Sequence, residues 1–179
     1  MKYLIVSDIH GAIDSAEVVI DRFVEEKCDY ILCLGDILYH GPRNDLPEFY
    51  KPKEVIKLLN EYSDKIIAIK GNCEAEVDQM VLNFKINDSL DMNINGLNCH
   101  LEHGHHLDET LEGDYSKYDV ILYGHTHIPD NTFKGKTLLF NPGSITLPKN
   151  GSKRSYAIWD NKKITLYDIL GDELDSYTY

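Results

Sequence analysis

The chain has 179 residues, of which 42% are hydrophobic and 27% are charged, and its formal net charge is -12 at pH 7. This length supports one hydrophobic core, so we expect a single domain over residues 1–179. The acidic excess argues against general nucleic-acid binding, because phosphate backbones are bound by Lys and Arg clusters, and no apolar run approaches the roughly 20 residues of a membrane span.

The N-terminus and the cysteines indicate a cytoplasmic protein. The apolar run from Tyr3 to Val6 is too short for the core of a signal peptide and is followed by the polar Ser7. The four cysteines lack the paired spacing of a zinc or redox motif, so we expect reduced thiols. We therefore place the chain in the cytoplasm, away from membranes, and expect a small substrate.

The first half of the chain alternates short apolar runs with amphipathic segments. The runs at residues 3–7, 30–34 and 66–70 have the length and composition of buried parallel strands. Between them, residues 15–26 and 53–61 carry apolar side chains at helical spacing. This order predicts a βαβαβ unit.

The second half is rich in hairpins. Two apolar segments flank Asn95-Gly96, a dipeptide that favours a tight turn between antiparallel strands. The strands expected in this half cover residues 90–94, 97–101, 120–123, 131–133, 137–140, 156–159 and 164–169. Two mixed sheets packed face to face, with helices outside, accommodate the whole order. We predict an α/β fold, a four-layer αββα sandwich.

Several apolar runs are followed, within one to three residues, by a side chain that can bind a metal ion. These side chains are Asp8, Asp36, Asn72, His103 and His125. Because ligands bind outside the carboxyl ends of strands in open α/β sheets, we expect them to converge. His10 and His127 each follow one of them by two residues, a spacing that directs both side chains to the same side. Carboxylate, amide and imidazole ligands together suit Mn²⁺, Fe or Zn²⁺ rather than Ca²⁺.

Most of these motifs have a structural alternative when taken singly. Asp8 to His10 is compatible with a turn and a helix N-cap, and Gly35-Asp36 with an ordinary turn. Gly71 to Glu74 is compatible with a loop that opens a helix. Nothing structural requires both His125 and His127 directly after a buried strand. The conjunction of all four motifs favours a metal site.

In this order the motifs resemble the signature of the calcineurin-like binuclear metallophosphoesterases, over residues 1 to about 148. The resemblance implies that Asp36 bridges two metals. One metal would be held by Asp8, His10, Asp36 and His127, and the other by Asp36, Asn72, His103 and His125. Residues 40–52 and 141–144 are similar to segments of the YfcE-type bacterial phosphodiesterases. Several of these form homo-oligomers, which implies a homodimer or homotetramer.

The resemblance implies hydrolysis of a small phosphodiester. We expect two divalent ions, Mn²⁺ first and Fe, Zn²⁺ or Ni²⁺ as alternatives, to activate a bridging hydroxide that attacks phosphorus. The expected catalytic residues are Asp36, Asn72 and Cys73. The broad family usually has a His where this chain and the YfcE-type branch have Cys73, and its absence favours diesters with good leaving groups. Cys73 either donates a weak hydrogen bond or is a small residue that fits.

Loop residues and histidine choices leave alternatives open. Arg43 is expected on a phosphate oxygen and His40 near the leaving group. The alternative is an Arg that caps the loop and a His that packs on a Tyr. His105 is the second choice of ligand after His103, and His106 is expected to face solvent.

Two other functions also stay open. One is a phosphomonoesterase or nucleotide pyrophosphatase that uses the same site. The other is a non-catalytic protein-binding scaffold like the retromer subunit of this fold. The acidic, Tyr-rich residues 171–179 are expected to be a solvated or subunit-contact end.

Overall fold

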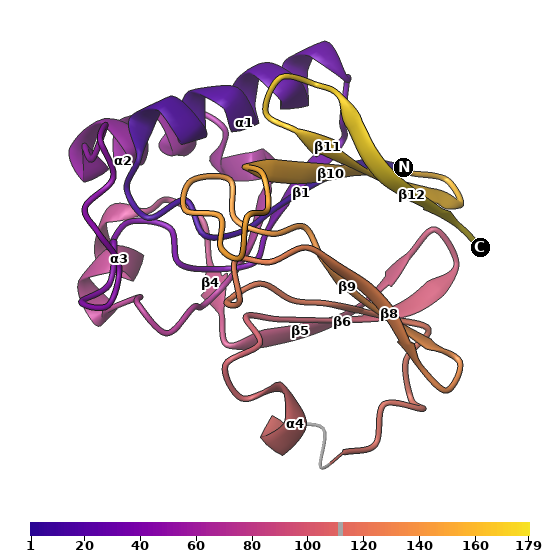
Figure 1. Cartoon of the computed structure of the whole chain (residues 1–179). Helices are drawn as coiled ribbons and strands as arrows, with labels where there is room; N and C mark the ends of the chain where they lie inside the picture. The colour runs from indigo at the N-terminus through magenta and orange to yellow at the C-terminus, as the bar shows by residue number, and fades with distance from the viewer. Residues whose placement is uncertain (111–112) are drawn as a thin grey trace.

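The chain begins with the βαβαβ unit that its apolar runs predict, as the computed structural model in Figure 1 shows; the structure describes residues 1–110 and 113–179. The strands of this unit pair in parallel. Its elements are β1 (Lys2–Val6), α1 (Ile13–Glu25), β2 (Tyr30–Cys33), α2 (Pro52–Asn60), a 3₁₀ turn at Ser63–Lys65, and β3 (Ile66–Ile69). Pro52 suits the first turn of α2, where its missing N–H has no partner to lose.

The larger sheet has the strand order β12-β11-β10-β1-β2-β3-β4. Its remaining strands are β4 (Ile86–Asn87), β10 (Ser155–Asp160), β11 (Lys163–Asp168) and β12 (Glu173–Thr178). The C-terminal residues thus form an edge strand, most of whose side chains are exposed to solvent. Strands β4 and β12 and helix α3 (Glu76–Val81) are not among the elements that the sequence predicts.

The smaller sheet has the order β5-β6-β7-β9-β8, with parallel strands at its centre and an antiparallel strand at each edge. Its strands are β5 (Ser89–Ile94), β6 (Leu97–Glu102), β7 (Val120–Leu122), β8 (Asp130–Lys134) and β9 (Thr137–Asn141). Asn95 and Gly96 both have positive φ angles, of 52° and 94°, as the tight turn between β5 and β6 requires.

The two sheets pack face to face, and α1 and α2 cover the outer face of the larger one (Figure 1). Strand β1 alternates between two cores: Leu4 and Val6 face the helices, whereas Ile5 packs between the sheets. The predicted sandwich of two mixed sheets is therefore confirmed. Its fourth layer is thin, because the one-turn helix α4 (Leu107–Thr110) and a small apolar cluster cover the smaller sheet there.

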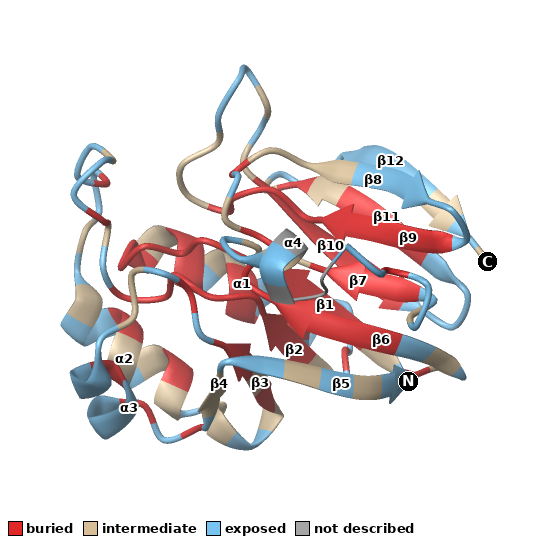
Figure 2. Ribbon diagram, turned by 90° about the horizontal axis from the view of Figure 1, so that it is seen from below, coloured by how far each residue is buried: buried red, intermediate tan, exposed pale blue. Residues whose placement is uncertain are grey.

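Burial is concentrated in the strands that carry the candidate site (Figure 2). All residues of β7 and β9 are buried, and so are four of the five residues of β1. The carboxyl ends of β1, β2 and β3 lie on one edge of the larger sheet, and those of β6 and β7 face them from the smaller sheet. Among the described helices, none is both long and apolar enough to cross a membrane.

Candidate metal centre

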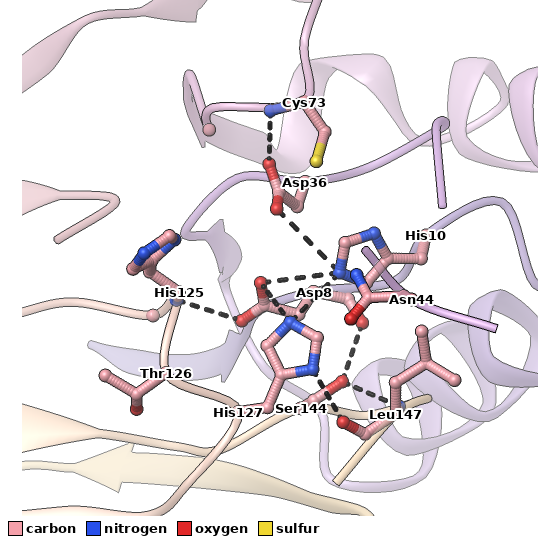
Figure 3. Close-up of polar contacts among 12 residues, drawn as sticks. Asp8, His10, Asp36, Asn44, Cys73, His125, Thr126, His127, Ser144 and Leu147 are labelled. Atoms are coloured by element: carbon pink, nitrogen blue, oxygen red, sulfur yellow. Dashed lines mark hydrogen bonds and ion pairs between the residues drawn. The ribbon is translucent and has the colours of Figure 1, made fainter. Parts of the chain in front are cut away.

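The predicted ligands follow the carboxyl ends of five strands. Asp8 and His10 follow β1, Asp36 follows β2, Asn72 follows β3, His103 follows β6, and His125 and His127 follow β7. The structure brings all seven together at the edge where the two sheets meet, and Figure 3 shows several of them. The expected convergence of these strand ends is therefore present.

Five of the seven predicted ligands have an unusual backbone conformation. Their φ angles lie between 50° and 66°, in a region that residues other than Gly rarely adopt. These residues are Asp8, His10, Asp36, His125 and His127. Nine such residues other than Gly occur in the described chain, so the site holds more than half of them. Strained backbone of this kind gathers at functional sites, where the surrounding structure holds it in place.

Glycines next to the ligands permit the close approach of neighbouring chains. A Cβ atom added to Gly71 would overlap the carboxylate of Asp36, and one added to Gly124 would overlap the hydroxyl of Ser7. Gly71 and Gly124 are thus required because a side chain at either position would collide with a neighbouring residue. Larger residues there would push the strand ends apart.

The candidate ligands form two groups, and we call Asp8, His10 and His127 the first ligand group. Nε2 of His10 lies 3.1 Å from Nε2 of His127. Asp8 Oδ1 lies 3.3 Å from His127 Nε2 and 3.7 Å from His10 Nε2. His10 donates from Nδ1 to the Tyr39 carbonyl at 2.7 Å, and His127 to the Leu147 carbonyl at 2.6 Å. Because a carbonyl only accepts, each Nδ1 carries a proton and Nε2 is the free ligand atom.

The second ligand group consists of Asn72, His103 and His125. Asn72 Oδ1 lies 3.1 Å from His103 Nε2 and 2.7 Å from His125 Nδ1. His103 donates from Nδ1 to the Leu34 carbonyl at 2.7 Å, which again leaves Nε2 facing the site. Asp36 lies between the groups, with Oδ2 at 3.4 Å from His103 Nε2 and 3.8 Å from the Nε2 of His10 in the first group.

The donor atoms fit a bound cation. Asp8 Oδ1 is buried and makes no hydrogen bond to any described residue. The Nε2 lone pairs of His10 and His127 face each other across 3.1 Å, an arrangement that a positive ion between them relieves. Three sets of possible donor atoms occur, and within each set the atoms lie within 4.8 Å of one another. Two sets contain oxygen and nitrogen donors, and the third also includes the sulfur of Cys73. Such donors suit transition-metal ions.

The charges in the site favour metal binding. Burial opposes ionisation of Asp36, but hydrogen bonding and charge interaction with His103 hold its pKa well below the usual range. Asp8 is likewise shifted to a lower pKa despite its burial. Burial lowers the pKa of His10, and burial and His103 lower that of His125 to about 4. Burial also opposes the charge of His103, yet Asp36 and Asp8 raise its pKa to about 9, which shows how strongly the carboxylates attract positive charge.

A pocket opens over the ligands. The loop of residues 41–44 lines one part of it and Lys149 another, together with Asn72, Cys73 and His125. Arg43 and Lys149 are its two basic lining residues, and both side chains are exposed. Lys149 is fixed at its backbone, where its N–H donates to the carbonyl of His127 at 3.2 Å. Sequence reasoning missed Lys149, whose one signal is its position after the segment at residues 141–144.

His40 lies apart from the pocket lining. Its ring packs edge-on against Tyr39 and Tyr50, with centroids 4.7 and 5.3 Å away. The Asn44 side chain donates to the His40 carbonyl at 2.8 Å and shapes the loop. This placement favours the alternative in which His40 packs on a Tyr.

The other histidines of β6 and its following loop take different positions. His100 hydrogen-bonds to Asp91 at 2.6 Å and to Glu102 at 3.3 Å, on the face of β6 away from the inter-sheet core. His105 is exposed, and its ring lies 5.5 Å from that of His103. His106 is exposed and pairs with Glu109. His103 is the member of this set that contacts both Asp36 and Asn72.

Comparison with known sequences gives a consistent result. A sequence profile of the calcineurin-like phosphoesterase superfamily domain matches residues 1–163. The chain is 40% identical to phosphodiesterase YfcE of Escherichia coli strain K12 over 167 residues, which cover 93% of this chain and 91% of that protein.

Comparison with solved structures agrees. The structure of the phosphoesterase Yfce from E. coli superposes with a TM-score of 0.90 at 36% identity, covering 99% of each chain. Vacuolar protein sorting 29 of Cryptosporidium parvum superposes with a TM-score of 0.67 at 16% identity, covering 99% of this chain and 98% of that one, and shows likeness of fold alone.

Proposed function

The chain belongs to the calcineurin-like phosphoesterase superfamily, and on that premise we propose that it hydrolyses small phosphodiesters with two divalent metal ions. The observation that carries the proposal is the convergence of seven candidate ligand side chains from five strand ends. The relative at 40% identity is named a phosphodiesterase, which supports a diester as the substrate.

The ligand groups divide the metals between them. The first ligand group would hold one ion and the second ligand group the other, with Asp36 contributing to both. When bound, divalent cations supply Lewis acidity to the phosphoryl oxygens and lower the pKa of water so that it attacks near neutral pH. We propose Mn²⁺ as the ion, with Fe, Zn²⁺ or Ni²⁺ as alternatives, because the shell mixes carboxylate, amide and imidazole donors.

The basic side chains of the pocket would bind the substrate phosphate. Arg43 and Lys149 line the pocket and offer charged N–H donors to non-bridging oxygens. Their charge also draws an anion toward a strongly acidic chain. We assign His40 a packing role within this loop, because its ring contacts Tyr39 and Tyr50.

Cys73 would act as a weak donor rather than a nucleophile. Burial and the charge of Asp36 raise the pKa of its thiol to about 12, so the proton stays on sulfur. Its backbone N–H donates to Asp36 Oδ1 at 2.9 Å and orients that carboxylate. Because a thiol donates only weakly to a departing oxygen, substrates with good leaving groups should turn over best.

We also propose a compartment, a domain organisation and an oligomeric state for the enzyme. The four cysteines are free thiols, as in a reducing compartment, which supports the cytoplasm. A single domain over residues 1–179 agrees with the two sheets sharing one apolar core. A homodimer or homotetramer rests on the likeness of residues 40–52 and 141–144 to YfcE-type segments, and light scattering would test it.

The test pairs metal analysis with activity. Purified protein should take up two equivalents of Mn²⁺ and hydrolyse bis(4-nitrophenyl) phosphate faster than 4-nitrophenyl phosphate. Protein that binds Mn²⁺ but prefers the monoester would overturn the diester assignment. Protein that binds no divalent ion would leave only a scaffold function for this fold.

A further inference from the structure

We propose that two side chains outside the ligand set, those of Ser144 and Glu74, position the two halves of the site separately. Ser144 fixes the first ligand group, and Glu74 fixes Asp36 and the loop that carries Asn72. The inference rests on the proposed metal site. Its consequence is that removing either side chain changes the binding of the two ions in a different pattern.

The hydroxyl of Ser144 is fully used. The residue is 0% exposed, and its hydroxyl donates to the Asp8 carbonyl at 2.9 Å. The same oxygen accepts from the Thr146 N–H at 3.1 Å and from the Leu147 N–H at 2.8 Å. A serine hydroxyl has one hydrogen and two lone pairs, so every hydrogen-bonding capacity is occupied. Removing it leaves three backbone groups without this partner.

The segment 144–147 holds both strands that carry the first ligand group (Figure 3). The Thr146 hydroxyl donates to the Ile9 carbonyl at 2.8 Å, beside the Ser144 contact to Asp8. The Leu147 carbonyl accepts from His127 Nδ1 at 2.6 Å and so sets the direction of its Nε2. The segment 144–147 therefore aligns Asp8 with His127, although the strands that precede these two residues belong to different sheets.

An arginine anchors this segment to helix α1. Arg154 donates from Nε to the Ile145 carbonyl at 2.8 Å. Its Nη2 atom lies 2.8 Å from both Asp14 Oδ2 and Ser15 Oγ. The segment is thus tied to helix α1 as well as to the loop that carries Asp8, which lets Ser144 act as a fixed point.

Glu74 positions Asp36 and the loop that carries Asn72. Its Oε1 accepts from the Ile37 N–H at 2.6 Å, and its Oε2 accepts from the Asp36 N–H at 2.9 Å and from the Gly71 N–H. One carboxylate therefore joins the loop after β2 to the loop after β3. This join fixes Asp36, which lies between the groups, and the backbone just before Asn72.

The variants Ser144→Ala and Glu74→Gln remove these contacts with little change of volume. In Glu74→Gln the amide group must replace one carboxylate oxygen, and an amide N–H₂ cannot accept from a backbone N–H. Either orientation of the new side chain therefore opposes at least one of the donors from Asp36, Ile37 and Gly71. Because neither residue is a predicted ligand, any effect on metal binding would act through the positions of the ligands.

The expected effect on metal binding differs between the two variants. In a titration with Mn²⁺ followed by electron paramagnetic resonance, Ser144→Ala should weaken one ion by about 10- to 100-fold, the range seen for partners of metal ligands, and leave the other near its wild-type affinity. Glu74→Gln should weaken both ions, because Asp36 contacts both groups. Equal weakening of both ions by Ser144→Ala, or no weakening by either variant, would overturn the inference.

Matched controls separate positioning from general loss of stability. Thr137→Val removes a hydroxyl that is as buried as that of Ser144 and lies 2.7 Å from the Tyr118 carbonyl. Asp168→Asn alters a carboxylate that accepts from the backbone N–H groups of Leu170 and Asp172, each at 3.0 Å. Both controls should destabilise the fold and leave both Mn²⁺ affinities unchanged. A control that weakens Mn²⁺ binding as much as Ser144→Ala would count against the inference.

Hydrogen exchange of the metal-free chain gives a second readout. Ser144→Ala should speed exchange at the amides of Thr146 and Leu147, and Glu74→Gln at those of Asp36, Ile37 and Gly71. Exchange at wild-type rates at these amides would overturn the inference. If wild-type protein binds no divalent ion, the proposed function fails, whereas the amide exchange still decides whether these side chains position the site.

Discussion

The two ligand groups differ most in their access to solvent. Asp8 and His10 are 0% exposed and His127 is 2% exposed, so the first ligand group lies beneath the pocket. In the second ligand group, His103 is 1% exposed, but Asn72 is exposed and His125 is half-buried, so this group is open on one side. From this difference we expect that the first group would anchor its ion and that the second group would meet the incoming substrate.

The largest expected effect is that of metal removal. A chelator should abolish diester hydrolysis completely, and the ions should leave in two phases, because Asn72 and His125 leave the second ligand group partly open to solvent, whereas the first is enclosed. Metal content and activity, measured together during dialysis, follow the two phases. Loss of both ions in a single phase would contradict the difference between the groups. Restoring Mn²⁺ should restore activity.

Asp36→Asn should have the next largest effect. Its carboxylate lies between the groups, so the amide should weaken both ions and lower kcat/KM by about 10²- to 10³-fold, the scale of losing a main electrostatic contact in a transition state. Steady-state kinetics with bis(4-nitrophenyl) phosphate and metal analysis measure both. Asp168→Asn is the control for a carboxylate outside the site. Wild-type turnover by Asp36→Asn with both metals retained would refute the bridging role.

The convergence of the candidate ligands could be predicted from the sequence, because it depends on topology. A ligand residue directly after a buried run lies at a strand end, and parallel strand ends share one edge of a sheet. The motifs around Asp8, Asp36 and His125 follow this rule, and the structure brings them together. The helical and strand periodicities of the first half also match the observed elements within a few residues.

What could not be predicted depends on loops and on short elements. Strand β4 has two residues and α3 has six, too few for a periodic signal. Strand β12 is exposed on nearly all its residues, so its composition resembles a solvated tail. The contacts of Glu74 could not be predicted from the sequence, because its partners Asp36 and Ile37 are 38 and 37 residues away.

A substitution of Lys149 tests whether the pocket binds the substrate phosphate. Lys149→Met should raise KM for the diester by about tenfold, the cost of one hydrogen bond to a charged group, and change Mn²⁺ binding little. Lys136→Met removes an exposed charge from the turn between β8 and β9 and is the matched control. Equal changes in the two variants would mean that net charge, rather than contact with phosphate, sets the affinity.

The smallest expected effect is that of His100 protonation on the free energy of unfolding. Burial lowers the pKa of His100, but hydrogen bonds with Glu102 and Asp91 outweigh it and raise the pKa above the usual value. The protonated form therefore favours the folded state. Its contribution is complete below the unfolded pKa of about 6.5 and is lost as the pH rises through the folded-state value.

The measurement for His100 is urea unfolding at about pH 6 and about pH 9. Wild-type protein should lose more stability between these two pH values than His100→Gln does, because the variant lacks the titrating group. Tyr118 also faces His100, and its ring is 4.9 Å away, so Tyr118→Phe is the control for the neighbouring phenol. An identical pH dependence in wild type and His100→Gln would refute the stabilising charge.

The central claim is that two ions share one carboxylate between an enclosed and a partly open ligand group. Anomalous diffraction from crystals grown with Mn²⁺ tests it most directly. Two peaks are predicted, one within bonding distance of Asp8, His10 and His127 and the other within bonding distance of Asn72, His103 and His125, with Asp36 touching both. A single peak, or two peaks without Asp36 between them, would contradict the account.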